Sequence, residues 1–357
     1  MLKIIFFLKK IIIFVFVKKC NLNLIYNMKK IRISVVGLGH IGKIHCKLLA
    51  KNKSVDFVGV YDIDIKRKYT IAAEYKVKYF ADISDTILNS DAVIIATSTI
   101  HHKEIAKKVI LAGKHCFIEK PVCSNVKEAE ELLRLSARHH NLKIQVGHIE
   151  RLNPAILSAK RYNLNPVFIE AHRLTEFQAR STDISVVNDL MIHDIDLVLF
   201  LTNSKVKNIY ASGVSIITDS IDLANARLEL ENGLIANLTA SRISTKSERK
   251  FRIFQKDTYL SLNLKEYNLE IFKMIDCKGM DITADNLLPT QKLIDLPTIE
   301  DKKIVFETPK ITKANSMEIE QSNFISSIIG QPIITCTLYE GVEALKVAER
   351  ISEIIAK

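Results

Sequence analysis

The chain has 357 residues, 48% of them hydrophobic, which is enough for two domain cores and excludes a disordered protein. The formal net charge is +11, but five of the lysines fall within residues 1–27 and the other bases are spread along the chain. That distribution argues against a nucleic-acid-binding face. The six cysteines form no CxxC pair, which favours reduced thiols in the cytoplasm over disulfides or a metal site.

Residues 1–27 form an unusual basic and apolar extension. Their apolar run, Ile4 to Val17, is interrupted by two lysines and is too short to span a bilayer. No small-residue cleavage site of a signal peptide follows it. We expect the natural start at Met28 and no membrane span, with a membrane-surface anchor as the alternative.

The first regular pattern runs from Ile31 to Asp62. A short β-favouring apolar run, residues 31–36, predicts a buried parallel strand, and apolar residues at helical spacing follow it. A second apolar run, Val55 to Tyr61, ends on Asp62. The turn between strand and helix carries three glycines at fixed offsets: Gly37, Gly39 and Gly42.

This strand, glycine turn, helix, strand and acid occur in the order of a dinucleotide-binding unit. Gly37 permits the tight turn, Gly39 lets the backbone approach a pyrophosphate, and Gly42 lets the helix pack on the strand. Asp62 can accept hydrogen bonds from the ribose hydroxyls of NAD and would repel the 2′-phosphate of NADP. Arg67 leaves NADP open as an alternative.

Two domains follow from the order of predicted elements. Residues 28–149 alternate strand and helix, which predicts a doubly wound parallel sheet. Residues 150–357 begin with a helix at 154–160 and continue with runs typical of an antiparallel sheet, where Asn232-Gly233 indicates a hairpin. The predicted strands of this α/β domain are 167–174, 209–217, 222–231, 234–241 and 250–255, its helices include 189–201, 317–329 and 339–355, and residues 263–312 are not assigned.

Polar residues at two predicted strand ends mark the ligand crevice of such a sheet. Residues 97–102 follow one strand, and Glu119-Lys120-Pro121 follows another. Proline restricts the residue before it and so fixes how Lys120 projects. A lone lysine is usually solvated, but this position makes Lys120 a candidate for the reaction site.

The third candidate is the pair Asp189 and His193. On a helix these two residues share one face, so the carboxylate could orient the imidazole as a general base. The alternative is a structural role for the pair, in helix capping or in a salt bridge. The spacing also suits a metal, but no third ligand is evident, so we expect none.

The glycine turn, Glu-Lys-Pro and the Asp-x-x-x-His-x-x-Asp motif resemble the Gfo/Idh/MocA oxidoreductases over residues 28–357. The resemblance implies a Rossmann domain followed by an α/β domain with a large, mostly antiparallel sheet, and a homo-oligomer that packs through the open face of that sheet. It also places Lys120, Asp189 and His193 at the substrate. His102 matches a family histidine, whereas Ser98 replaces the proline of its TPxxxH segment.

Residues 146–154, 170–174 and 182–187 are similar to the branch of the family that oxidises the 3-hydroxyl of UDP-N-acetylglucosamine with NAD. In that branch a partner aminotransferase then installs a 3-amino group used in lipid A. Arg151, Arg173 and Arg180 are candidate pyrophosphate partners, because guanidinium pairs bidentately with phosphate. Each arginine could equally belong to a structural ion pair.

The expected mechanism is hydride transfer from the carbinol carbon to the nicotinamide. His193 would take the hydroxyl proton, Asp189 would orient His193, and Lys120 would stabilise the alkoxide, although Lys120 is an alternative base. Other substrates, such as UDP-N-acetylglucosaminuronate or inositol, remain alternatives. So does a non-catalytic NAD sensor, against which the presence of all three residues argues.

The expected contacts form two sets. Those to NAD come from Gly37, Gly39, His40, Ile41, Gly42, Asp62, Thr97, His102, Glu119 and Lys120. Those to substrate come from Lys120, His148, Arg151, Asn153, Arg173, Asp189 and His193.

Overall fold

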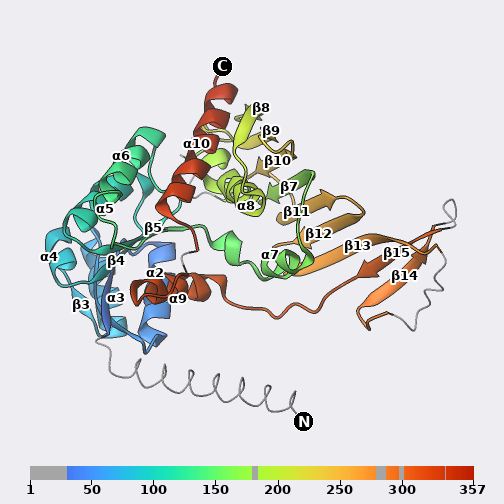
Figure 1. The fold of residues 1–357 in the computed structure, drawn as a ribbon. Helices are drawn as coiled ribbons and strands as arrows, with labels where there is room; N and C mark the ends of the chain where they lie inside the picture. The colour runs from blue at the N-terminus through green and yellow to red at the C-terminus, as the bar shows by residue number, and fades with distance from the viewer. Residues whose placement is uncertain (1–29, 179–183, 279–286, 297–300, 334) are drawn as a thin grey trace, which may run out of the picture.

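The computed structural model describes residues 30–178, 184–278, 287–296, 301–333 and 335–357 (Figure 1). The extension of residues 1–27, the expected start at Met28 and Arg180 lie outside these ranges. Within them, no helix is long and apolar enough to cross a membrane. All five described cysteines are free and buried.

The first half of the chain folds into a six-stranded parallel sheet in the order β3-β2-β1-β4-β5-β6. The sequence prediction of a doubly wound sheet is confirmed. The strands are β1 (Ile31–Val36), β2 (Val55–Tyr61), β3 (Lys78–Tyr79), β4 (Ala92–Ile95), β5 (His115–Glu119) and β6 (Ile144–Gly147). The helices between them are α2 (His40–Lys51), α3 (Ile65–Tyr75), α4 (Ile83–Leu88), α5 (His102–Leu111) and α6 (Val126–Ser136).

The second half forms a nine-stranded sheet in the order β14-β15-β13-β12-β11-β7-β10-β9-β8, in which only β7 and β10 pair in parallel. This confirms the large, mostly antiparallel sheet. Its strands are β7 (Phe168–Leu174), β8 (Val206–Val214), β9 (Leu223–Leu230), β10 (Ile235–Ser241), β11 (Glu248–Gln255), β12 (Thr258–Asn263), β13 (Asn268–Asp276), β14 (Gln291–Asp295) and β15 (Lys302–Glu307).

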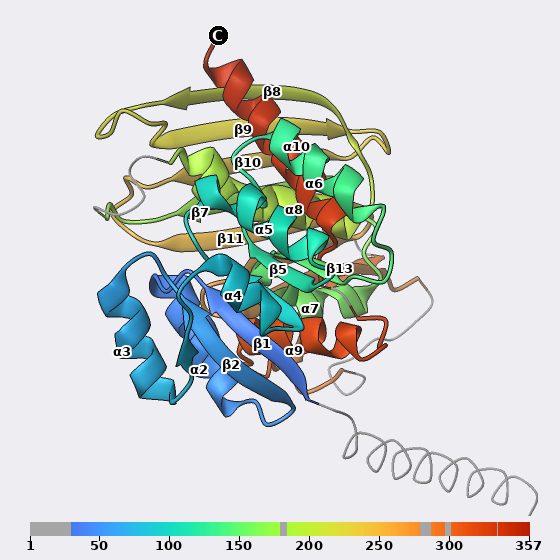
Figure 2. The ribbon, with the colours of Figure 1, turned by 90° about the vertical axis from the view of Figure 1, so that its left-hand side faces the viewer.

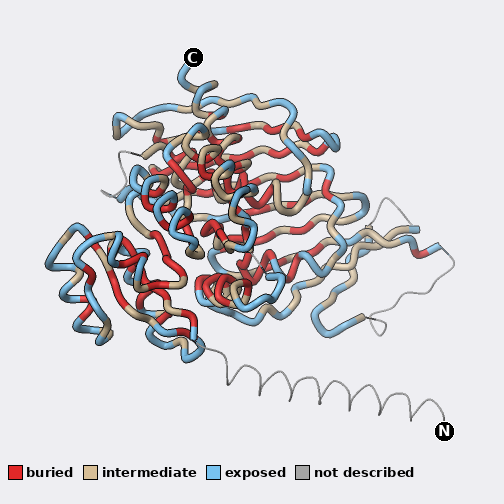
Figure 3. The backbone as a smooth tube through the Cα atoms, turned by 60° about the vertical axis from the view of Figure 1, so that its left-hand side comes forward, coloured by how far each residue is buried: buried red, intermediate tan, exposed pale blue. Residues whose placement is uncertain are grey.

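Helices cover one face of this second sheet. Buried and less buried residues alternate along its central strands, as Figure 3 shows. The buried side chains pack with α7 (Pro154–Ala159), α8 (Ile192–Thr202) and α10 (Leu338–Ile355) into one apolar core. The opposite face carries half-exposed side chains.

The last two helices join the two halves. In α9 (Ser316–Ile328), Phe324 packs edge-on to Phe117 of β5, inside the core of the first sheet. Helix α10 contacts α6 on one side and β8 and α8 on the other, and Figures 1 and 2 show it between the two sheets. The division into domains between residues 149 and 150 stays a prediction. The contacts of α9 and α10 show that the chain's last 40 or so residues contribute to the cores of both halves.

Candidate active site

Two cavities adjoin at the carboxyl ends of the parallel strands, where ligands bind in open α/β sheets, and a third lies beside the first. The first, of about 830 Å³, lies between the two sheets, and the second, of about 420 Å³, lies against β1 and β2. They share Gly39 and the strand end at residues 96–98. The third, of about 370 Å³, extends the first away from the Rossmann sheet.

The glycine turn is built as its spacing predicts. Gly37 has φ +91°, and a Cβ there would stand 2.5 Å from the backbone nitrogen of Thr97. A Cβ on Gly42 would stand 1.8 Å from the carbonyl oxygen of Gly37, so only glycine lets α2 begin this close to the strand. A Cβ on Gly39 would meet no atom within 4 Å. Gly39 therefore leaves open the space where a pyrophosphate would meet the start of α2, and the turn fits NAD.

Asp62 lines the second cavity and is held rigidly. Its carboxylate accepts the N–H groups of Leu38 at 2.6 Å and Asp64 at 2.8 Å. Each oxygen keeps a further lone pair, so the carboxylate can still accept ribose hydroxyls. Arg67, the residue that left NADP open, also lines this cavity, and its guanidinium pairs with Asp64 at 3.1 Å.

Most of the other expected NAD contacts reach a cavity wall. His40, Ile41, Glu119 and Lys120 line the first cavity, and Thr97 lines both. His102 and Gly42 are not among the lining residues. The buried His102 ring instead bonds the carbonyl oxygens of Thr97 at 3.1 Å and Pro121 at 2.9 Å. It ties together the two loops that border the cavity.

The Lys120 ammonium projects into the first cavity and is fixed by one residue. Nζ donates to the backbone oxygen of Asp189 at 2.7 Å and to its carboxylate at 3.0 Å. The sequence-based expectation paired Asp189 with His193 instead. Asp189 lies in a π-helical turn, Val187–Met191, before α8, and that wider turn departs from the regular helix on which the expectation rested.

His193 lines the same cavity as Lys120 and Asp189. Its Nδ1 is buried without a hydrogen-bond partner in the described part of the chain. Burial, followed by the nearby charges of Lys120 and Arg173, holds the pKa of His193 well below its usual range. The imidazole is therefore neutral at pH 7 and can accept a proton.

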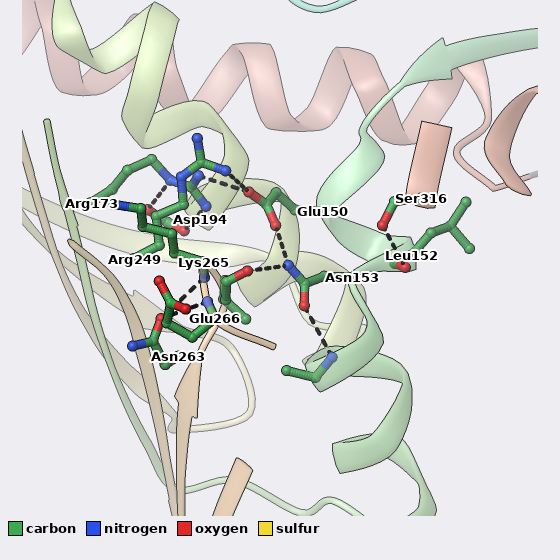
Figure 4. A network of polar contacts seen from close by, with 12 residues as sticks. Glu150, Leu152, Asn153, Arg173, Asp194, Arg249, Asn263, Lys265, Glu266 and Ser316 are labelled. Carbon is green, nitrogen blue, oxygen red and sulfur yellow. Dashed lines mark hydrogen bonds and ion pairs between the residues drawn. The ribbon is translucent and has the colours of Figure 1, made fainter. Parts of the chain in front are cut away.

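Arg173 lies on the cavity wall within a buried ion-pair network (Figure 4). Its guanidinium bonds both carboxylate oxygens of Asp194, at 2.7 and 3.0 Å, and Glu150 at 2.9 Å. Asn153 donates to Glu150 at 3.0 Å, and Arg249 from the neighbouring strand reaches Glu150 at 3.3 Å. Most of the N–H donors of the Arg173 guanidinium are thus already bonded to protein carboxylates.

Arg151 and His148 do not reach the cavities. The Arg151 side chain is only 2% exposed and pairs with Asp196 at 2.7 Å and with Glu340 at 2.6 Å. His148 is buried beside Asp196 and Cys336, with ligand atoms close enough for a metal ion. The guanidinium of Arg151 already bonds both oxygens of Asp196, and this arrangement suits an internal ion pair better than a metal site.

Glu320 is an unusual buried acid in α9 near these groups. Neither of its carboxylate oxygens has a partner among the described residues. Burial, then the nearby Glu119 and Asp196, raises the pKa of Glu320 well above 4.5, and Arg151 opposes the shift only in part. Glu320 therefore keeps its proton to a higher pH in the fold than an ordinary glutamate does.

The raised pKa of Glu320 predicts that the stability of the fold decreases as pH rises. Above pH 4.5 the unfolded chain releases the Glu320 proton while the fold retains it, so the free energy of unfolding falls as pH rises, by up to about 1.4 kcal/mol per pH unit. Glu320→Gln keeps the neutral shape and removes this term. Urea denaturation should show that, between pH 5 and pH 8, the free energy of unfolding of the variant increases relative to that of the natural protein. Glu318→Gln, at an exposed position of the same helix, is the control, and an equal gain there would contradict the assignment.

Several cavity residues were not predicted from sequence. Glu150 was quoted only as part of a motif, and Arg242, Arg249 and Lys265 were not singled out. Arg249 lies opposite Arg173 in the register of β7 and β11, which strand alternation could have shown had the pairing been known. Lys265 falls in the segment that sequence analysis left unassigned.

Known proteins give the same assignment as this geometry. Residues 31–148 match the family described as "Oxidoreductase family, NAD-binding Rossmann fold", and residues 158–260 match the "GFO/IDH/MocA C-terminal domain". The chain is 32% identical to UDP-N-acetylglucosamine 3-dehydrogenase of Acidithiobacillus ferrooxidans, over 91% of this chain and 97% of that protein.

Solved structures agree. The structure of that Acidithiobacillus ferrooxidans enzyme superposes with a TM-score of 0.80 and 31% identity, covering 92% of this chain and 98% of the other. The scyllo-inositol dehydrogenase of Lactobacillus casei, solved with bound NAD(H) and scyllo-inositol, has the same fold, with a TM-score of 0.72 and 20% identity over 92% of this chain and 97% of the other. The chain therefore belongs to the Gfo/Idh/MocA oxidoreductase family and is an NAD-dependent dehydrogenase.

Proposed function

We propose that this NAD-dependent sugar dehydrogenase oxidises the 3-hydroxyl of UDP-N-acetylglucosamine to the 3-keto sugar. The observation that carries the proposal is the meeting of Lys120, Asp189 and the neutral His193 on one cavity wall beside the glycine turn. The similarity to an enzyme of that name over nearly the whole chain supports this choice of substrate. A binding protein without turnover would need only the turn and Asp62.

In the proposed reaction, the imidazole of His193, which lines the first cavity, accepts the proton of the sugar hydroxyl. The Lys120 ammonium stabilises the negative charge that develops on the same oxygen. Asp189 holds that ammonium in place through its carboxylate and its carbonyl oxygen, so we assign it to positioning Lys120. NAD, when bound, supplies the acceptor for the hydride.

The full chain, incubated with NAD and UDP-N-acetylglucosamine, should produce NADH absorbance. A carbonyl trap or an aminotransferase with an amino donor should be present, because alcohol oxidation by NAD stalls early. NADH with this nucleotide sugar and not with UDP-N-acetylglucosaminuronate or inositol supports the proposal. NADH only with one of the latter two would replace the substrate, and NAD binding without turnover on any sugar would favour a sensor.

The biological context is also a proposal. The 3-keto product is a substrate for a pyridoxal-dependent aminotransferase, and we propose that the resulting 3-amino sugar supplies lipid A synthesis. This partner is functional and need not bind the chain. The cytoplasm remains our expected location, where buried thiols such as those of the five described cysteines stay reduced.

We propose a homo-oligomer that forms through the open face of the second sheet. Five aromatic rings lie in register across five adjacent strands on this face, and each is only partly buried. Neighbouring ring centroids are 4.7 to 5.7 Å apart. A self-complementary apolar stripe of this kind suits a second copy of the chain. Light scattering should give a multiple of the chain mass, and a monomer would contradict the proposal. The rings are those of Phe168, Phe254, Tyr259, Phe272 and Phe306.

A further inference from the structure

The third cavity is a feature that the reaction chemistry leaves unexplained. It shares six lining residues with the first cavity, so the two lie next to each other; together they are called the passage, from the reaction site to the far end of the third cavity. Lys120 and His193 line the near end, and Tyr267 and Asn315 line the far end. The wall common to both cavities includes Glu150, Arg249 and Lys265.

Two cations on this common wall are available to a ligand. The Arg249 side chain is 43% exposed, and its single ion pair in the described chain is the 3.3 Å contact with Glu150. The exposed Lys265 makes no side-chain hydrogen bond or ion pair with any described residue. Arg173, in contrast, is occupied by Asp194 and Glu150. A polyanion in the passage would therefore bind Arg249 and Lys265.

The backbone around Lys265 is fixed. Asn263 accepts the N–H groups of Lys265 and Glu266, both at 3.1 Å, within the turn between β12 and β13 that Figure 4 shows. The carbonyl of Leu264 accepts from the buried Asn153 at 2.9 Å, so the turn is tied to the Glu150 network. Since these contacts are already made, a ligand need not order the turn when it binds.

The far end of the passage has a different chemistry. Tyr267 offers a half-buried aromatic ring from a backbone with φ +56°, a conformation that side-chain-bearing residues rarely adopt. Asn315 accepts the N–H groups of Met317 and Glu318 with its side-chain oxygen, and its amide N–H₂ has no partner within the described ranges. An aromatic face and a free amide donor together suit a planar heterocycle with carbonyl acceptors.

We propose that the third cavity is the nucleotide subsite, in which Arg249 and Lys265 bind the diphosphate and Tyr267 and Asn315 contact the nucleoside. The order along the passage is sugar, diphosphate, nucleoside, which is the covalent order of a nucleotide sugar. Arginine provides a bidentate phosphate contact and lysine a point charge. The inference rests on the proposed function, because it assumes that a nucleotide sugar is the substrate.

Binding of UDP alone tests the subsite without requiring turnover. Calorimetry on the full chain should show that Arg249→Gln and Lys265→Gln each raise the Kd of UDP about tenfold, the loss expected for one charge-assisted hydrogen bond. Their KM for UDP-N-acetylglucosamine should rise similarly, with kcat within about twofold, because the reacting groups are untouched. Lys256→Gln, at an exposed position of the neighbouring hairpin, is the matched control and should behave like the natural protein.

Lys265→Gln is the decisive variant, since Arg249 also contacts Glu150 and its loss could disturb that network. If the natural protein binds UDP and oxidises the nucleotide sugar while Lys265→Gln and Arg249→Gln bind UDP equally well, the subsite is wrong and the proposed function stands. If the natural protein binds NAD but neither binds UDP nor oxidises any nucleotide sugar, the proposed function fails and the subsite fails with it.

Discussion

Replacing Lys120 by methionine is expected to lower kcat roughly 100-fold or more, as loss of one preorganised donor to a developing oxyanion does. Methionine keeps much of the length of the side chain but removes the ammonium that Asp189 holds in the cavity. The Kd of NAD should change no more than about twofold, because the glycine turn and Asp62 lie in other elements. Steady-state kinetics and titration with NAD measure the two effects separately.

Two further variants sharpen this experiment. Asp189→Asn retains the carbonyl contact to Lys120 but loses the charged one, so kcat should fall less than in Lys120→Met while the dependence of kcat on pH changes. Lys256→Met places the same substitution on an exposed hairpin and should leave both constants unchanged. An equal loss of NAD binding and turnover in Lys120→Met would mean that Lys120 supports the fold of the site and would remove it from the reaction.

The parts of the site that depend on local chain geometry were predictable from sequence. The glycine turn and Asp62 were identified because a tight turn, a close helix and a strand end each require a particular residue at a particular offset. Lys120 was identified because proline restricts its backbone and the strand order places it at the crevice. In each case the structural requirement involves only a few neighbouring residues, so the local sequence pattern is enough to predict it.

Predictions that depended on a partner elsewhere in the fold were less complete. Asp189 and His193 are four residues apart, but the π-helical turn at Val187–Met191 and the approach of Lys120 from the other domain decide what Asp189 contacts. Neither feature can be predicted from the four-residue spacing of Asp189 and His193. Arg151 was a candidate for phosphate because guanidinium pairs bidentately with phosphate, whereas in the fold its partners are Asp196 and residues 335–340.

The last two strands, β14 and β15, show a second limit. β15 is half-buried at every position and β14 is exposed at alternate and terminal positions, so neither has the regular alternation of apolar and polar residues that predicts a strand. β15 pairs with β13, and β14 pairs in turn with β15 at the edge of the sheet. Segments that complete a sheet at its edge take their conformation from the neighbour more than from their own sequence.

Replacing Arg151 by methionine is expected to destabilise the fold by roughly 3–5 kcal/mol, the cost of leaving a buried partner charge uncompensated. Arg151 bonds both oxygens of Asp196 in α8, Glu340 in α10 and the carbonyl of Thr335, and its guanidinium stacks 4.7 Å from the Phe200 ring centroid. One side chain therefore links the segment after β6 to α8 and α10. Urea denaturation followed by circular dichroism measures the loss.

The double variant Arg151→Met with Asp196→Leu separates lost packing from unpaired charge. If the cost comes mainly from the buried carboxylate, the double variant should be more stable than Arg151→Met alone, because replacing both partners by apolar groups removes the uncompensated charge. Arg161→Met, at an exposed position, should change the free energy of unfolding by less than about 0.5 kcal/mol. A similarly small loss in Arg151→Met would show that the ion pair contributes little and that packing alone holds these helices together.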